Sequence, residues 1–151
     1  MPKVTSKKFN KEIFSAIGTM SGTSFDGVDV SFLKTDGEKI YYMGQSSYMP
    51  YPTQVRKNIA DLIASPHNID LDILLETSNQ ITNIHAEAIK KNLKKNNLKN
   101  SDVDLIGFHG QTIYHNPSKL ITLQIGNPHL LHNLTQIQVI SDIRNKDIAQ
   151  Q

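Results

Sequence analysis

Residues 18–29 form the stretch of the chain that is richest in groups able to surround a phosphate. The stretch reads GTMSGTSFDGVD and lies between two apolar, strand-like runs. Glycine lets the backbone approach a ligand closely, and successive N–H groups and hydroxyls can bind phosphate oxygens. Asp26 and Asp29 could hold a magnesium ion, directly or through water. The stretch is not a Walker A loop, because no lysine follows its second glycine. The alternative is a hairpin turn that makes only local hydrogen bonds.

A second candidate site lies at residues 107–112, which read GFHGQT and follow a short apolar run. In open α/β sheets, ligands bind beyond the carboxyl ends of the strands, where His109, Gln111 and Thr112 would supply polar groups. His115 lies nearby, but two histidines without a carboxylate or a cysteine make a weak metal site. The alternative is a structural histidine whose hydrogen bonds are satisfied within the fold.

A third candidate site lies at residues 142–147, which read DIRNKD and again follow a strand-like run. The guanidinium of Arg144 could form a forked pair of hydrogen bonds with a carboxylate or a phosphate, and the neighbouring acids could orient it. The alternative is a solvated loop with no ligand.

A group of lysines lies near the end of a predicted helix and could contact nucleic acid. Its members are Lys90, Lys91, Lys94, Lys95 and Lys99. Lysines at a helix C-terminus also suit the helix dipole, and no aromatic residues lie between them to stack on bases. The whole chain has 16 Lys and Arg against 14 Asp and Glu, a net charge of only +2. We therefore expect a solvated helix face and no nucleic-acid partner.

The elements that must position these groups follow from the hydrophobic pattern. Apolar runs at residues 13–17, 28–33 and 40–48, with the turn pair Asp36–Gly37 between the last two, predict a meander of three antiparallel strands. The pattern then changes to the period of a helix. It predicts helices near residues 55–63 and 70–97, strands at 103–108, 120–125 and 136–140, and a short helix begun by Asn127 and Pro128. Strands alternating with helices indicate a mixed α/β domain.

Composition limits the class of protein. The chain has 151 residues, of which 38% are hydrophobic and 20% charged, as in one ordinary globular domain. It has no cysteine, which excludes disulfides, thiolate zinc sites and cysteine nucleophiles. Its apolar runs are too short to span a bilayer, and residues 1–11 form a polar leader without the apolar core of a secretory signal. We expect a cytoplasmic protein without a membrane partner.

Four stretches, taken together and in order, closely resemble the anhydro-N-acetylmuramic acid kinase family. They are residues 20–29 (MSGTSFDGVD), 109–117 (HGQTIYHNP), 122–127 (TLQIGN) and 142–149 (DIRNKDIA). The resemblance covers residues 13–149 but less than half of the family's length. It implies the two-lobed ATPase fold of actin and the sugar kinases, built on a ribonuclease H-like mixed sheet with helices. Residues 12–151 would then be an incomplete N-terminal lobe.

The resemblance also implies an activity. In this family ATP, with Mg²⁺, phosphorylates the 6-oxygen of 1,6-anhydro-N-acetylmuramic acid while water opens the anhydro bridge, giving N-acetylmuramic acid 6-phosphate for cell-wall recycling. By resemblance, Asp26 would hold magnesium through water, and His109, Gln111 and Arg144 would face the sugar. The residues that would bind the phosphates of ATP are Gly22, Thr23, Ser24, Phe25, Asp26, Gly27, Val28 and Asp29.

The sequence departs from the family pattern at Phe25, Asn127, Ile143 and Asn145, where the family usually has Leu or Met, Asp, Phe and Arg. A larger departure is that the family continues beyond the position of Gln151. Its continuation holds a glycine-rich segment, the adenine pocket and a second phosphate loop, whose aspartate resembles the general base. The catalytic residue is therefore not expected within residues 1–151.

We predict that the 151-residue chain alone forms no phosphosugar, because a general base must lie within hydrogen-bond reach of the proton that it removes. It would act with a complementary second chain, as half of a split enzyme, or as a homodimer. The alternative is a non-catalytic remnant that keeps a phosphate-binding module. Incubating the purified chain with magnesium-ATP and the anhydro sugar checks this, and any enzyme-dependent phosphosugar would contradict the prediction.

Overall fold

The computed structural model describes residues 12–144, so the predicted leader at residues 1–11 and the last part of the stretch 142–149 lie outside the described residues. The chain forms a mixed α/β fold, as predicted. The strands are β1 Phe14–Met20, β2 Gly27–Thr35, β3 Ile40–Met43, β4 Ser47–Pro50, β5 Leu105–Gly107, β6 Gln111–Asn116, β7 Ile121–Ile125 and β8 Gln138–Ile140. The helices are α1 Thr53–Ala64, α2 Leu71–Lys95 and α3 Pro128–Thr135, with short 3₁₀ turns at Asn100–Asp102 and Pro117–Lys119.

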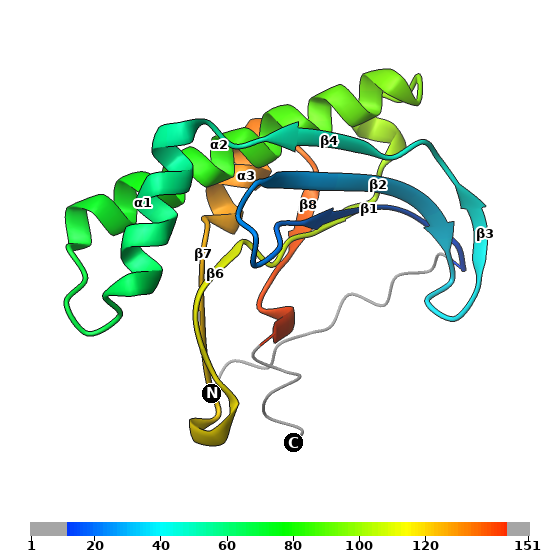
Figure 1. Ribbon diagram of the computed structural model, residues 1–151. Helices are drawn as coiled ribbons and strands as arrows, with labels where there is room; N and C mark the ends of the chain where they lie inside the picture. Colours follow the sequence, from blue (N-terminus) through cyan, green and yellow to red (C-terminus); the bar gives the residue numbers. More distant parts are fainter. Residues whose placement is uncertain (1–11, 145–151) are drawn as a thin grey trace, which may run out of the picture.

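The first strands form the predicted antiparallel meander (Figure 1). At its second turn, Asp36 Oδ1 accepts hydrogen bonds from the amides of Glu38 at 2.9 Å and Lys39 at 2.7 Å. The predicted third strand is wrong in one respect, since the structure divides it into β3 and β4, which pair with opposite ends of β2. The division has a physical cause in α2. Asn96 Oδ1 accepts from the Gln45 amide at 2.7 Å, and Asn92 Nδ2 donates to the Gln45 carbonyl at 3.0 Å, so the backbone of Gln45 bonds to the end of the helix and not to the sheet.

Parallel pairing extends the main sheet beyond the meander. The described strands have the order β3-β2-β1-β5-β8, with β4 also on β2, and β5 runs parallel to both β1 and β8. Two reciprocal bonds fix the start of β5, because the Ser15 amide donates to Asp104 Oδ2 at 2.7 Å and the Asp104 amide donates to the Ser15 carbonyl at 2.8 Å. As a result, β1, β5 and β8 end at the same edge of the sheet.

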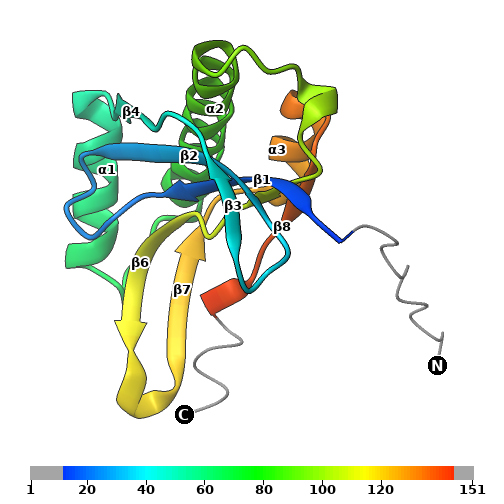
Figure 2. The same cartoon turned by 90° about the vertical axis from the view of Figure 1, so that its right-hand side faces the viewer.

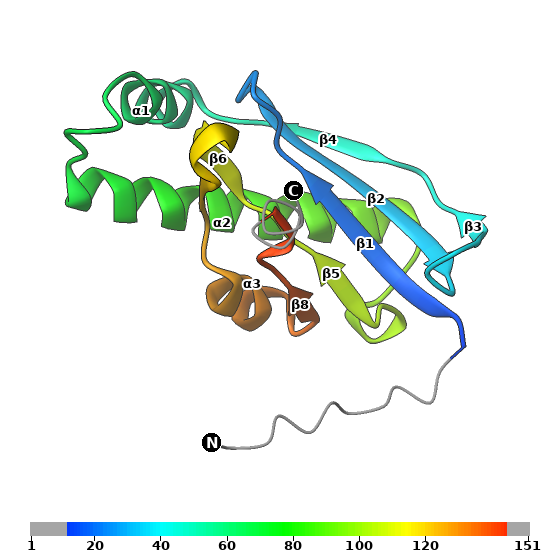
Figure 3. The ribbon, with the colours of Figure 1, turned by 90° about the horizontal axis from the view of Figure 1, so that it is seen from below.

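The core lies between this sheet and the helices. A row of apolar side chains crosses four strands in register, through Phe32, Ile17, Ile106 and Val139. The first three are at most 2% exposed, and burial of each such side chain contributes roughly 1.5–3 kcal/mol. Figure 3, seen from below, shows β1 crossing in front of α2 and β8 beside α3, so that both helices lie against the sheet. No helix among residues 12–144 has the length and apolarity needed to cross a membrane.

A second, two-stranded sheet projects away from the main one. Strands β6 and β7 pair from Gln111↔Ile125 to Asn116↔Ile121 and form an arm that extends below the main sheet in Figures 1 and 2. The sequence reading treats β6 as a site loop and does not predict it as a strand. The pairing of β6 with β7 is irregular, because the register shifts between Thr112 and Tyr114.

Histidine 85 is a fully buried titratable group in the middle of α2. One ring nitrogen, Nδ1, lies 2.9 Å from the Ile81 carbonyl and must donate to it, whereas Nε2 is buried without a hydrogen-bond partner. The ring meets the edge of Phe108 at 5.0 Å between centroids. Burial and, to a smaller extent, the nearby His109 lower the pKa of His85 to about 4, although the hydrogen bond to the Ile81 carbonyl opposes the shift.

We predict that His85 makes the fold sensitive to acid. An unfolded histidine has a pKa near 6.5, so between about pH 6.5 and pH 4 the unfolded chain binds more protons and stability falls as the pH falls. The loss reaches about 3 kcal/mol at most. Urea unfolding at pH 7.5 and pH 5 should show a smaller loss for His85→Leu than for the wild type. The exposed His129→Leu is the matched control, and an equal acid loss in His85→Leu and wild type would contradict the assignment.

Candidate functional site

The phosphate hairpin, as we call residues 21–26, is predicted to bind phosphate and lies between the end of β1 and the start of β2. Its tip is a tight turn in which the Phe25 amide donates to the Gly22 carbonyl at 3.1 Å. Phe25 has φ +40°, a left-handed conformation that is uncommon for a residue with a side chain. The polar side chains of Thr23, Ser24 and Asp26 are exposed at this tip. The tip therefore presents two hydroxyls and a carboxylate to solvent.

The structure divides the predicted stretch 22–29 into this tip and the start of a strand. Gly27 begins β2, where a Cβ atom would lie 2.3 Å from the Met49 carbonyl oxygen, so glycine lets β4 pair closely here. Val28 is fully buried in the core, and its side chain cannot contact a phosphate. Asp29 is exposed on β2, opposite Tyr48 of β4. Of the last three residues, only Asp29 presents a polar side chain.

Asp26 has the properties expected of a ligand for a hydrated metal ion. Ser24 Oγ donates to its Oδ1 at 2.8 Å, and this bond, followed by the backbone amides, lowers the pKa of the exposed Asp26 carboxyl. Mg²⁺ keeps several waters and commonly binds one or two carboxylates together with substrate phosphates. Among the described residues, no group of three or more histidine or acidic side chains could hold a metal without such help. The residues fit a magnesium ion that a nucleotide brings with it.

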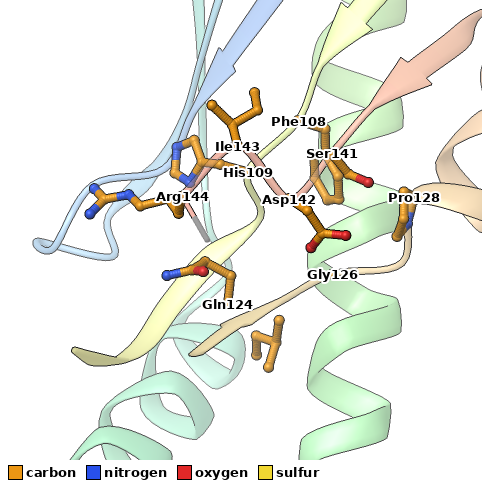
Figure 4. A pocket seen from close by; sticks show the side chains of 10 residues that line it. Phe108, His109, Gln124, Gly126, Pro128, Ser141, Asp142, Ile143 and Arg144 are labelled. Carbon is orange, nitrogen blue, oxygen red and sulfur yellow. The ribbon is translucent and has the colours of Figure 1, made fainter. Parts of the chain in front are cut away.

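A pocket opens at the carboxyl ends of β5 and β8, beside the end of β7. Its empty volume is about 370 Å³, open mouth included. Its lining consists of Phe108, His109, Gln124, Ile125, Gly126, Pro128, Ser141, Asp142, Ile143 and Arg144. Figure 4 shows the polar ends of His109, Gln124 and Arg144 on one side of the pocket, while the carboxylate of Asp142 lies on the other, towards Gly126 and Pro128. The pocket thus offers donors, acceptors and both signs of charge to a polar ligand.

His109 brings a partly buried imidazole to the pocket. Its Nδ1 atom is buried and has no hydrogen-bond partner within the described structure. Burial lowers the pKa of His109, and the positive charge of Arg144 lowers it further. The imidazole is therefore neutral at pH 7 and can both donate and accept a hydrogen bond.

Two glycines let the backbone segments around the pocket cross closely. Gly110 has φ +69°, and a Cβ atom there would lie 2.2 Å from the Ile125 carbonyl oxygen. Gly126 has φ +134°, and a Cβ atom there would meet the ring of Phe108 at 2.6 Å. The same crossing is tied to α2, since the Gly126 amide donates to Ser78 Oγ at 3.0 Å. The position of His109 therefore depends on a backbone packing that larger residues would prevent.

The structure brings His109 and Arg144 together but places Gln111 elsewhere. Gln111 is fully buried and does not line the pocket, and its side chain bonds to Ser21 and Gly22 at the base of the phosphate hairpin.

Asp142, which the third candidate site includes as an acid that could orient Arg144, also lines the pocket. The sequence reading misses Gln124 as a lining residue, although it belongs to a stretch that carries the family resemblance. It also misses Tyr51, whose hydroxyl lies 2.8 Å from Ser21 Oγ at the base of the hairpin, because neither spacing nor motif marks this residue.

The sheet order, with an antiparallel meander followed by parallel strands and a pocket at their carboxyl ends, is that of the N-terminal part of a sugar-kinase ATPase fold. The sequence profile of the family described as anhydro-N-acetylmuramic acid kinase matches residues 14–151. The chain belongs to this family.

Relatives that carry the family's name are found in several bacteria. The anhydro-N-acetylmuramic acid kinase of Rhodopseudomonas palustris is 38% identical over 142 residues, which cover 91% of this chain and 39% of that protein. Those of Agrobacterium fabrum and Methylobacterium nodulans are also 38% identical, over 148 and 149 residues, covering 91% and 89% of this chain and 38% and 40% of theirs. The chain thus spans about two-fifths of the length of the curated relatives that it matches.

We predict that Arg144 controls the protonation of His109. Because the arginine charge disfavours the imidazolium, Arg144→Gln should raise the pKa of His109 and bring it closer to its ordinary value. An NMR titration of the histidine ring protons measures this directly. Lys57→Gln, which removes an exposed charge on α1, serves as the control. An unchanged pKa of His109 in Arg144→Gln would show that the two side chains do not interact in solution.

Proposed function

We propose that residues 12–151 supply the N-terminal lobe of an ATP-dependent kinase that phosphorylates 1,6-anhydro-N-acetylmuramic acid and opens its anhydro ring. Membership of the family supports the reaction, and the geometry supports the assignment of ATP and the sugar to two separate sites. The tip of the phosphate hairpin would bind the phosphates of ATP, and the pocket with His109 and Arg144 would bind the sugar. A second lobe or a complementary chain would supply the general base. Such a kinase would work in the cytoplasm, where ATP is held.

One observation carries the proposal, namely that the hairpin and the pocket lie at the same edge of the sheet. The hairpin follows β1 and the pocket follows β5, which pairs with β1 in parallel register up to Gly18↔Gly107. Only Gly110 separates His109, which lines the pocket, from Gln111, which bonds to the hairpin. Phosphoryl transfer depends mainly on holding donor and acceptor in line, and this arrangement sets the two ligands side by side.

The individual residues have distinct proposed roles. The hydroxyls of Thr23 and Ser24 and the amides of the tip would donate to phosphate oxygens. Asp26 would bind the hydrated magnesium ion, which neutralises phosphate charge when the nucleotide is bound. The neutral His109 would hydrogen-bond a sugar hydroxyl, while the guanidinium of Arg144 would pair with the carboxylate of the substrate. No step of the chemistry is assigned to a base within the described residues.

We predict that magnesium-ATP stabilises the chain against thermal unfolding, since a ligand that binds only the native state raises its stability by mass action. At a concentration 100 times the Kd, the gain is about 2.7 kcal/mol. Asp26→Asn should lose most of the rise in Tm, whereas Asp61→Asn, an exposed aspartate on α1, should keep it.

The proposed binding of the sugar is tested by a separate measurement. Calorimetric titration with 1,6-anhydro-N-acetylmuramic acid should show binding that Arg144→Gln weakens and Lys57→Gln does not. A Tm that responds to neither nucleotide nor sugar would contradict the proposed function for this chain. A response to nucleotide alone would leave a phosphate-binding module.

A further inference from the structure

A buried chain of hydrogen bonds connects β6 to the phosphate hairpin. Tyr51 Oη lies 2.8 Å from Ser21 Oγ, Ser21 Oγ bonds to Gln111 Oε1, and Gln111 Nε2 lies 3.2 Å from the Gly22 carbonyl oxygen. The three side chains are 4%, 3% and 0% exposed, so this network is closed to solvent. It joins parts of the chain that are 30 and 90 residues apart in sequence.

The direction of every bond in the network follows from the Gln111 amide. Its Nε2 lies 3.2 Å from two carbonyl oxygens, those of Gly22 and Thr112, and only an NH₂ group can donate to both. Oε1 must then face Ser21, whose hydroxyl donates to it. That hydroxyl has a single proton, so Tyr51 Oη must be the donor to Ser21 Oγ. Burial raises the pKa of Tyr51 well above its ordinary value, so the phenol keeps the proton that this requires.

The network holds both ends of the hairpin tip. The Gly22 carbonyl that accepts from Gln111 also accepts from the Phe25 amide at 3.1 Å, the bond that closes the turn. At the other end, the Tyr51 amide donates to the Asp26 carbonyl at 2.8 Å. The strained Phe25 lies between these two fixed points. Uncommon backbone conformations of this kind persist only where the surrounding structure imposes them.

We propose that Gln111 is a positioning residue of the phosphate hairpin, which it holds through Gly22 and Ser21 in the shape that binds nucleotide, and that it does not contact the sugar. The inference rests on the proposed function, because that function is what assigns nucleotide binding to the hairpin. The opposite directions of neighbouring side chains support it, since His109 lines the pocket while Gln111, beyond the positive-φ Gly110, is buried against the hairpin.

The test compares two replacements of Gln111 in the full 151-residue chain. Gln111→Met keeps the approximate shape but removes the acceptor of the Ser21 hydroxyl proton and one of the two donors to the Gly22 carbonyl. Gln111→Glu keeps the acceptor but turns a carboxylate oxygen towards two carbonyl oxygens. We expect both to weaken magnesium-ATP binding, measured by calorimetry, by about tenfold or more. Near pH 5.5 a protonated Glu can donate to the Gly22 carbonyl, so its affinity relative to wild type at the same pH should recover, whereas that of Gln111→Met should not.

Amide hydrogen exchange gives a readout that needs no ligand. In Gln111→Met, exchange of the Phe25 amide, which donates to the Gly22 carbonyl, should be faster by about tenfold or more, while the amides of β5 and β8 keep their rates. Thr135→Val is the matched control, because it removes a buried hydroxyl bond to the Leu131 carbonyl in α3, away from the hairpin. It should lower the stability without changing nucleotide affinity or hairpin exchange.

Each outcome decides one of the two proposals. Unchanged nucleotide affinity in both Gln111 variants, or a loss of sugar binding alone, would overturn the positioning role. An equal loss of nucleotide affinity in Thr135→Val would overturn it too, because the effect would then be one of general stability. If the wild-type chain binds no nucleotide, the proposed function fails. The exchange rate of the Phe25 amide then decides whether Gln111 holds the hairpin.

Discussion

The parallel pairing of β5 with β1 on one side and β8 on the other is the constraint on which the rest of the structure depends. Gly107 of β5 is the partner of both Gly18 and Ile140, so three segments separated by about 90 and 30 residues reach the same row of the sheet together. A slip of one residue would turn Ile106 away from the core and misplace every group beyond the row. The reciprocal bonds between Ser15 and Asp104 oppose such a slip.

Beyond that row, a very short piece of backbone contacts both the hairpin and the pocket. The hairpin leaves β1, the pocket forms around the ends of β5 and β8, and residues 109–111 lie between them. Gly110 makes this possible because its left-handed backbone and missing side chain let the chain pass against the Ile125 carbonyl. The side chains of His109 and Gln111 can then serve different neighbours. Even a small backbone shift at Gly110 would disturb both.

The sequence predicts the parts of the fold that rest on local pattern. The helical period gives α1 and α2, and Asn127 caps α3 as predicted, accepting from the Leu130 amide at 3.0 Å. Contacts between distant residues could not be predicted in this way. The division into β3 and β4 depends on Asn92 and Asn96, about 50 residues further along the chain.

For the site, the residue types predict the hairpin tip, with Asp26 at its end, and a polar pocket after β5. They do not predict which side of a strand each polar group takes. Gln111 is an example, because its position in a motif suggests a ligand contact whereas its burial is set by Ser21 and Tyr51, which no local pattern connects to it. Val28 belongs to the stretch that is predicted to bind phosphate, but it lies in the core, because side chains along a strand point alternately to the two faces of the sheet.

Strands β3 and β4 both pair with the outer side of β2 and so form one edge of the main sheet. This arrangement affects how readily two copies of the chain associate. Long, flat edge strands invite another chain to add a strand, because their backbone groups are unpaired. Here that edge is made of two four-residue strands, β3 and β4, interrupted at residues 44–46, where the linker is bonded to α2. An incoming strand would find only a short ladder before the break. The exposed side chains of Tyr41, Tyr42 and Met43 can therefore face solvent with little tendency to seed edge-to-edge aggregation.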